Sequence, residues 1–164
     1  MLKKMMQITC WIAYDKVMKS AWIDKQHYGG LTVEWDYKER TCDLSIPGYL
    51  RHALARFEHP MPTQPEYAPH VHPKRQYGAK QQMTSDPDLS PAVNLKDQKL
   101  VREVVGVLLF YARAIDSTYF KTLSTLSTQL SKPTAKTMEA VTKVLNYSAT
   151  NPNAVLRFLS LIHI

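Results

Sequence analysis

Hydrophobic and polar residues alternate along two short stretches of the chain, residues 31–36 and 42–46. The apolar positions of these stretches are Leu31, Val33 and Trp35, followed by Cys42, Leu44 and Ile46. Alternation with a period of two places the apolar side chains of a strand on one face. A short polar connection, residues 37–40, joins the two stretches. The pattern therefore predicts a β-hairpin with one buried face.

A pattern with a helical period follows the hairpin. Pro47-Gly48 breaks the second strand, and the apolar residues then recur at i, i+4 and i+7: Leu50, Leu54 and Phe57. This spacing is typical of a short amphipathic helix, whose basic residues lie largely off the apolar face. Residues 28–59 are therefore predicted to form a hairpin-helix segment.

Proline dominates the next part of the chain, since seven of the ten prolines fall between Pro60 and Pro91. Proline removes a backbone donor and disfavours helix at the residue before it. Residues 60–96 are therefore predicted to be an extended surface linker. Residues 1–27, which precede the hairpin, form a separate N-terminal segment, for which we consider a short helix from Lys4 to Lys19.

Three apolar stripes with helical spacing follow, so residues 97–160 are predicted to form a three-helix subdomain. The stripes are Val101, Val104, Val105, Leu108, Leu109 and Ile115; Tyr119, Leu123, Leu126 and Leu130; and Met138, Val141, Leu145 and Ser148. Gly106 lies inside the first stripe at a cost of ~1 kcal/mol relative to Ala, which suggests close contact with another helix. Thr134 is a candidate cap of the third helix. Asn151-Pro152-Asn153 ends that helix, and residues 154–164 could begin a strand.

These elements predict an α+β fold that is mostly helical: a β-hairpin plus helix, a proline-rich linker and a three-helix segment. The hydrophobic content of 45% is ordinary for a globular protein. Cys10 and Cys42 form no CxxC pair, so we expect two reduced thiols in an intracellular protein of the cytoplasm or nucleus. No run approaches the ~18 apolar residues of a membrane span.

The charge of the chain points to an acidic partner. The 21 Lys and Arg residues exceed the 14 Asp and Glu residues, which gives a formal net charge of +7. Such a charge favours nucleic acid or an anionic membrane, although a merely basic protein is an equal alternative. Basic and aromatic residues interleave in the hairpin-helix segment, an arrangement that suits a nucleic-acid backbone and its bases. The candidate contact residues are Trp35, Tyr37, Lys38, Arg40, Arg51 and Arg56.

Two blocks of the chain resemble copia-type retrotransposon reverse transcriptases. The first comprises GGLTVEWD (Gly29–Asp36), CDLSIPGYL (Cys42–Leu50) and the helix to Phe57. It is similar to the primer-gripping hairpin and the start of the thumb. The second comprises LVREVVGVLLFYARAIDST (Leu100–Thr118) and Met138–Phe158, and it is similar to the connection region that leads to the ribonuclease H domain. The order and spacing of these blocks carry the resemblance.

The resemblance implies a non-catalytic thumb and connection fragment of a Pol polyprotein. A polymerase palm needs clustered carboxylates that hold two metal ions, and the chain contains no Asp-Asp pair. The first acidic residue of ribonuclease H would follow a strand similar to residues 161–164. We therefore expect neither catalysis nor a cofactor in this chain, since Mg²⁺ would belong to the palm and ribonuclease H sites outside it.

The partners that the resemblance implies are the backbone of an RNA–DNA or DNA duplex, bound without sequence specificity, and the remainder of the Pol polyprotein. The alternative is a remnant open reading frame that acts as a protein-interaction module or has no selected activity. A protein that binds anionic membranes is a third class, which draws only on the charge and the Met-rich start; our expectation is that no membrane is involved.

Two weaker patterns receive ordinary structural interpretations. His59, His70 and His72 are interpreted as solvated histidines rather than metal ligands, because no Cys or carboxylate follows at zinc spacing. Arg113 and Asp116 match the "R.D" positions of the resemblance, and we expect them to form a local salt bridge at a helix junction rather than to act in catalysis.

Overall fold

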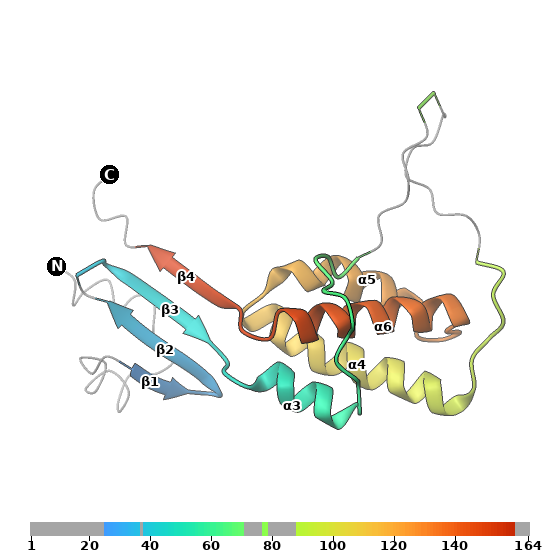
Figure 1. The fold of residues 1–164 in the computed structure, drawn as a ribbon, viewed down its shortest axis with the longest axis horizontal. Helices are drawn as coiled ribbons and strands as arrows, with labels where there is room; N and C mark the ends of the chain where they lie inside the picture. The colour runs from blue at the N-terminus through green and yellow to red at the C-terminus, as the bar shows by residue number, and fades with distance from the viewer. Residues whose placement is uncertain (1–24, 37, 71–76, 79–87, 160–164) are drawn as a thin grey trace. The chain divides into compact units, whose positions relative to one another are not determined.

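The computed structural model describes residues 25–36, 38–70, 77–78 and 88–159 (Figure 1). The helix considered for Lys4–Lys19 and the candidate Tyr37 lie outside these residues. The described chain has an α+β fold with more helix than strand, as predicted. It divides into a sheet unit, which comprises residues 1–47 and 153–164, and a helical unit, which comprises residues 48–152.

The sheet unit contains four antiparallel strands in the order β1-β2-β3-β4 (Figure 1). They are β1 (Lys25–Tyr28), β2 (Leu31–Asp36), β3 (Thr41–Ser45) and β4 (Val155–Leu159). β2 and β3 confirm the predicted hairpin, and β4 confirms the strand expected after the third helix. β1 was not predicted. Gly29 and Gly30 connect β1 to β2 with φ angles of +56° and +85°, left-handed values that glycine adopts in tight hairpin turns without steric cost.

Strand pairing gives the sheet one apolar face. Directly paired residues of antiparallel strands point to the same side of the sheet. Two rows of paired residues across β2, β3 and β4 are Val33–Leu44–Leu156 and Trp35–Cys42–Phe158. We call these six residues the apolar sheet face.

The opposite face of the sheet is mainly polar. Thr32 is buried, and its hydroxyl lies 3.0 Å from Nδ1 of His27 on β1. Glu34, Asp43 and Arg157 form a row across β2, β3 and β4. The alternation that predicted the hairpin therefore separates an apolar from a polar side, as the sequence indicates.

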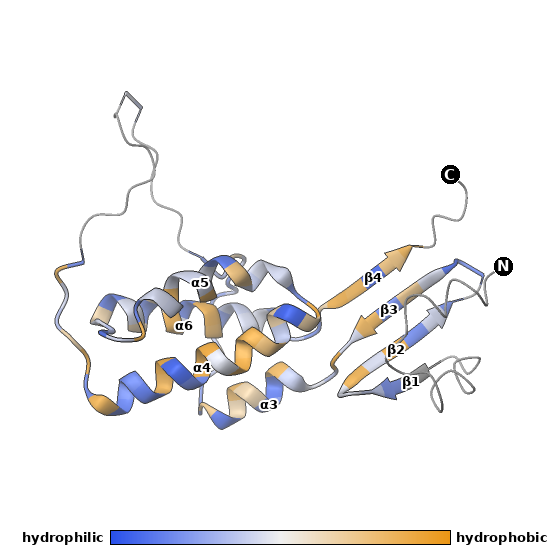
Figure 2. Cartoon of the chain, turned by 180° about the vertical axis from the view of Figure 1, so that it is seen from behind, coloured by the Kyte–Doolittle hydropathy of each residue, from blue (hydrophilic) through white to orange (hydrophobic). Residues whose placement is uncertain are grey.

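The helical unit contains four α-helices and a short 3₁₀-helix. They are α3 (Tyr49–Arg56), α4 (Leu95–Ala114), η1 (Ser117–Tyr119), α5 (Phe120–Thr128) and α6 (Ala135–Thr150). The three predicted stripes supply its core, in which Val101, Leu108 and Val144 are fully buried. Figure 2 shows apolar and hydrophilic residues interspersed along α4, as in an amphipathic helix.

Aromatic side chains connect the helices inside this core. The ring of Tyr49 stacks on that of Tyr111 with centroids 5.7 Å apart, and Tyr111 meets the edge of Tyr119 at 5.9 Å. The hydroxyl of Tyr119 lies 3.1 Å from Oγ of Ser148, so both buried hydroxyls are hydrogen-bonded. Burial raises the pKa of Tyr119 well above its ordinary value. Tyr119 is therefore a neutral hydrogen-bonding residue of the core.

Caps end the helices where the sequence indicates. Thr134 caps α6, because its Oγ1 accepts the N–H of Thr137 while the Thr137 hydroxyl accepts the N–H of Thr134. This reciprocal pair confirms the predicted cap. Asn151 is the C-terminal cap of α6, also as predicted. Asn94 caps α4, and its Oδ1 accepts the N–H of Asp97 at 2.8 Å.

The division into units differs from the predicted domains at α3. We grouped this helix with the hairpin, whereas it belongs to the helical unit. Leu50, Ala53 and Leu54 are buried, and the Tyr49 hydroxyl donates to the carbonyl of Val107 on α4 at 3.0 Å. The apolar face of a short helix predicts that it packs, but not which partner it packs against.

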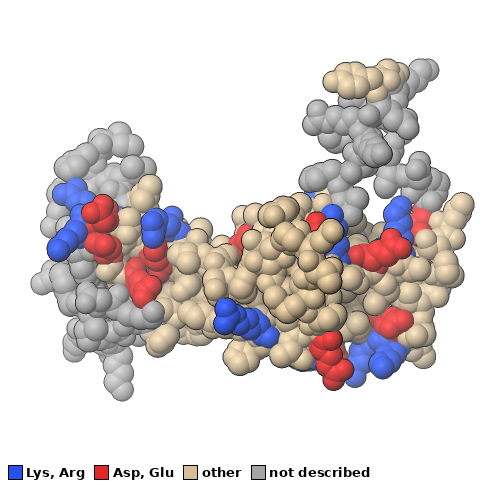
Figure 3. Space-filling model, viewed as in Figure 1, with Lys and Arg blue, Asp and Glu red and all other residues tan. Residues whose placement is uncertain are grey.

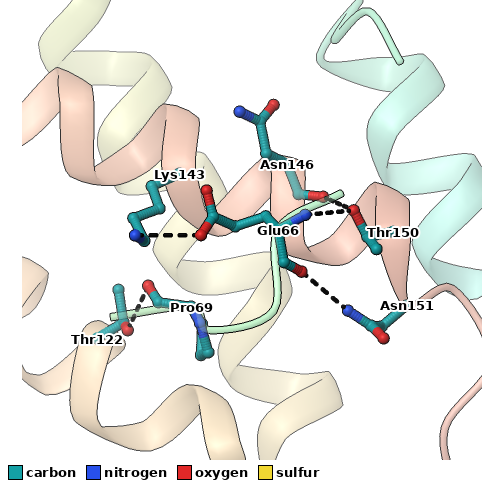
Figure 4. A network of polar contacts seen from close by, with 7 residues as sticks. All are labelled: Glu66, Pro69, Thr122, Lys143, Asn146, Thr150 and Asn151. Atoms are coloured by element: carbon teal, nitrogen blue, oxygen red, sulfur yellow. Dashed lines mark hydrogen bonds and ion pairs between the residues drawn. The ribbon is translucent and has the colours of Figure 1, made fainter. Parts of the chain in front are cut away.

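The proline-rich segment also needs correction, because its first part lies on the helical unit rather than free of it (Figure 4). The Glu66 carboxylate lies 3.1 Å from Nζ of Lys143 on α6, and the Glu66 N–H donates to Oγ1 of Thr150 at 3.1 Å. Thr122 on α5 donates to the carbonyl of Pro69 at 2.8 Å. The segment is extended, as expected, but side chains of α5 and α6 satisfy its backbone groups.

The last part of the predicted linker is anchored as well. The N–H of Val93 donates to the carbonyl of Pro133, and the N–H of Ala135 donates to the carbonyl of Pro91, each at 3.1 Å. These two bonds join residues 91–93 to the start of α6. Proline content indicates an extended backbone but carries no information about such long-range partners.

Candidate nucleic-acid interface

The hairpin turn presents two of the predicted contact residues to solvent. Lys38 and Arg40 are exposed in the connection between β2 and β3. The Asp36 carboxylate organises this turn, because its Oδ1 accepts the N–H of Lys38 at 2.9 Å and that of Glu39 at 3.0 Å. Such local side-chain bonds stabilise turns. Arg40 adopts a left-handed φ of +55°.

The turn is balanced in charge rather than strongly basic. Lys38 and Arg40 alternate with Asp36 and Glu39. On β3 and β4, Asp43 accepts two hydrogen bonds from Arg157, at 2.8 Å to Nε and 2.6 Å to an Nη atom. Across the described sheet unit, four basic residues (Lys25, Lys38, Arg40, Arg157) face four acidic ones (Glu34, Asp36, Glu39, Asp43). The described strands and turns therefore add no net charge.

The Asp43–Arg157 pair is visible in the protonation of its carboxylate. The hydrogen bond from Arg157 lowers the pKa of Asp43 below its ordinary value, and the same pairing raises the pKa of Arg157. Because the pair is open to solvent, we expect it to contribute little to global stability. Its effect is local, on the attachment of β4 to β3.

Trp35 lies in the sheet rather than beside the basic turn residues. It pairs with Cys42, which pairs with Phe158, in one row of the apolar sheet face. Trp35 is half-buried. This position favours packing against an apolar partner over stacking on a base. The other predicted aromatic, Tyr37, lies outside the described residues.

Arg51 and Arg56 are exposed on α3 in the helical unit. Arg56 lies 3.4 Å from the Glu103 carboxylate on α4 and 6.0 Å from the ring centre of Phe57. Part of its charge is thereby compensated. The predicted contact residues thus belong to two units, with Trp35, Lys38 and Arg40 in one and the two arginines in the other.

A basic stripe on α4 was missed by the sequence interpretation. It consists of exposed residues that recur every three or four positions: Lys96, Lys99, Arg102, Gly106, Phe110 and Arg113. Residues with this spacing lie on one side of a helix. One acidic residue, Glu103, borders the stripe, and it pairs with both Lys99 (3.9 Å) and Arg56 (3.4 Å). The α4 stripe therefore carries more positive than negative charge.

Gly106 occupies the middle of the α4 stripe, and this corrects the expectation that it marks a close contact between helices of the chain. It is exposed, and a Cβ atom built on it would meet no atom within 4 Å. The glycine therefore creates a bare stretch of helix backbone that no internal packing requires. A glycine among the charged residues on the outer side of a helix is the signal that could have identified this stripe.

Phe110 adds an aromatic surface to the α4 stripe, one turn beyond Gly106. Its side chain is 48% exposed, and its ring lies 5.5 Å from that of Tyr49 on α3. Burial raises the pKa of Tyr49, whose hydroxyl is bonded to α4. The stripe thus combines basic side chains, a gap at Gly106 and one aromatic ring supported from α3.

Figure 3 shows Lys and Arg beside Asp and Glu on the face in view, with no region of a single sign. The α4 stripe is therefore a narrow feature of one helix rather than part of a broad basic surface. A narrow row of cations is sufficient to follow the phosphates of a nucleic acid, which are themselves arranged in lines.

The weaker patterns of the sequence resolve as follows. His59 bonds Oδ1 of Asn146 at 2.7 Å through Nε2, while His72 lies outside the described residues. No group of three potential metal ligands occurs among the residues described. The expected Arg113–Asp116 salt bridge is wrong, because the Asp116 carboxylate caps η1 and accepts the N–H and hydroxyl of Thr118.

Three comparisons with known proteins found no match for the chain, whether against protein-family models, curated proteins or solved structures. The resemblance to copia-type reverse transcriptases therefore stays a prediction. Among the helices described, none has the length and apolar character needed to cross a membrane.

Proposed function

We propose that this chain is a non-catalytic, nucleic-acid-binding fragment of a copia-type reverse transcriptase, and that the α4 stripe contacts the backbone of a primer–template duplex. The observation that supports this most is Gly106, an exposed glycine at the centre of a basic helix face with no neighbour inside the chain. A mid-helix glycine costs about 1 kcal/mol relative to Ala. Close approach of an external partner explains its presence.

The chemistry of the α4 stripe suits a sugar-phosphate backbone. Arg102 and Arg113 lie on either side of Gly106 and offer donors to phosphate oxygens. The missing side chain at Gly106 lets the backbones of protein and nucleic acid approach. Phe110 offers an apolar ring to a sugar. None of these groups reads a pattern of base edges, so binding is expected to be nearly independent of sequence.

The hairpin turn is a secondary contact in this proposal. Lys38 and Arg40 reach into solvent, but Asp36 and Glu39 lie between and beside them. Neighbouring carboxylates reduce the potential that a phosphate experiences. We therefore assign the turn a smaller share of the binding than the α4 stripe.

The salt dependence of binding to an RNA–DNA hybrid duplex tests the proposal. In Arg102→Gln/Arg113→Gln, the affinity should fall at all base sequences, and the salt slope should decrease by about one unit per lost phosphate contact. Lys38→Glu/Arg40→Glu should have a smaller effect. A matched control is Lys132→Gln/Lys136→Gln, which neutralises two exposed cations elsewhere on the helical unit. An unchanged affinity and slope in the arginine variant would contradict the proposal.

A protein helix is the second candidate partner, because an exposed glycine beside an aromatic residue also lets another helix pack closely. This corresponds to the interaction-module alternative. The same titration separates the two, since a protein partner would leave the hybrid bound weakly and equally by the arginine variant and its control.

A further inference from the structure

The apolar sheet face has the composition of a core surface. Its six residues include no charged side chain, and they form two continuous rows across β2, β3 and β4. Leu156 is 37% exposed and Phe158 is 52% exposed, and the other four are half-buried. Phe158 alone can bury more than 150 Å². A sheet with one such face requires a second layer.

The described part of the sheet unit supplies no second layer, since it consists of four strands of one sheet and their connections. Nucleic acid does not suit this face, because no Lys or Arg belongs to it. The row that carries Arg157 lies on the opposite side, and Asp43 already compensates its charge. The occupant must therefore be apolar.

The first 24 residues of the same chain have the right composition. They hold four of the seven methionines (Met1, Met5, Met6, Met18) and two of the three tryptophans (Trp11, Trp22). Methionine adapts its shape to irregular apolar surfaces, and tryptophan buries a large area. These residues continue directly into β1 at Lys25, which pairs with Glu34, next to Trp35.

The segment is also long enough for this role. Four strands spaced by about 4.8 Å form a surface about 15 Å wide. Twenty-four residues extend about 36 Å even in the most compact regular form, the α-helix. The segment can therefore cross the whole face from its attachment at edge strand β1.

We propose that residues 1–24 cover the apolar sheet face and complete the core of the sheet unit. The proposal is independent of nucleic-acid binding. It treats the N-terminal segment as the second layer of the sheet, and it accounts for an apolar face beside an apolar segment of the same chain.

The two cysteines of the chain allow a direct test, because Cys42 lies in the centre of the apolar sheet face and Cys10 lies in the segment. In full-length Cys10→Ser, Cys42 should react slowly with iodoacetamide. Adding Trp11→Asp/Ile12→Asp should accelerate this reaction by at least about tenfold, because charges oppose docking on an apolar face. The matched control is Gln7→Asp/Thr9→Asp, which changes polar positions of the same segment and should leave the rate nearly unchanged.

A second measurement needs no substitution. A short bismaleimide should link Cys10 to Cys42 within one chain faster in native buffer than in concentrated urea, because docking brings the two thiols together. Equal rates in the two solvents would overturn the proposal, as would equal alkylation rates in the two double variants. Links that form mainly between copies, with Cys42 protection that rises with protein concentration, would assign the face to a second copy and also overturn it.

Discussion

Replacing Gly106 with Ala separates a role in binding from a role in folding. The site is exposed in the middle of α4, and an added Cβ meets no atom within 4 Å. Alanine should therefore stabilise the helix by about 0.5–1 kcal/mol, through the lower backbone entropy of its unfolded chain. For a chain of this size, 1 kcal/mol corresponds to a rise of about 2–4 °C in Tm.

The same substitution should weaken binding of the hybrid duplex. The new methyl group stands where the proposal places the partner's backbone, and overpacking of a close contact costs about 1–3 kcal/mol. The lower end of this range corresponds to about a fivefold rise in Kd. A larger residue, as in Gly106→Gln, should raise Kd further without lowering Tm, since the space around the helix is open.

Two measurements on the same samples check this prediction: thermal unfolding followed by circular dichroism, and fluorescence anisotropy of a labelled RNA–DNA hybrid. The control is Ser124→Ala on α5, another exposed helical site, where a better helix former should raise Tm slightly and leave Kd unchanged. Equal Kd values for Gly106→Ala and the parent chain would refute the close contact. A lower Tm would show that Gly106 has a packing role.

Three further predictions follow from the fold and the sequence. Limited proteolysis should cut first within residues 71–87, while residues 60–70 stay protected; Glu66→Ala, which loses the ion pair with Lys143, should expose that part, and unchanged protection would show that the contact is dispensable. Because the pKa of Asp43 is lowered in the fold, its pairing stabilises β4 above the carboxyl's unfolded pKa, and this contribution is lost as the pH falls through the folded pKa. Amide exchange of β4, corrected for intrinsic rates, should therefore accelerate at low pH, and Asp43→Asn should remove most of that dependence. The purified chain should give no primer extension with Mg²⁺ or Mn²⁺, since it has no paired carboxylates for two metals; extension above background would contradict the assignment as a thumb and connection fragment.

The regular elements of the fold could be predicted because each has a clear period. The alternation at Leu31, Val33 and Trp35 gave β2, and the spacing at Tyr119, Leu123 and Leu126 gave the buried side of α5. β1 has no such signal, since the sequence Lys-Gln-His-Tyr lacks alternation. It is a strand because the glycine turn at Gly29–Gly30 pairs it with β2, and pairing of this kind depends on the neighbour rather than on propensity.

Tertiary partners were harder to predict than elements. The apolar residues of α3 indicated a buried side, but only its contacts reveal that Val107 and Glu103 of α4 are its neighbours. The anchoring of Glu66 depends on Lys143, Thr150 and Asn151, about 80 residues further along the chain. No local pattern encodes contacts at this separation.

The candidate site shows the same limit. Lys38 and Arg40 were chosen as basic residues in a turn, but the fold places carboxylates beside them. Gly106 was noticed for its cost to the helix, but the buried stripe gave no reason to expect an open environment. Only the packing of α4 distinguishes a glycine that admits an internal neighbour from one that leaves a bare outer surface.

The two proposed surfaces have opposite chemistry, so each can be tested without disturbing the other. The α4 stripe is basic and should bind through ionic contacts that salt weakens. The apolar sheet face is uncharged, and its docking should depend little on salt. Gly106→Ala should therefore change hybrid binding without affecting Cys42 alkylation, and Trp11→Asp/Ile12→Asp should do the reverse. If the N-terminal variant also lost hybrid binding at unchanged helical content, part of the nucleic-acid interface would have to lie in the sheet unit rather than on α4.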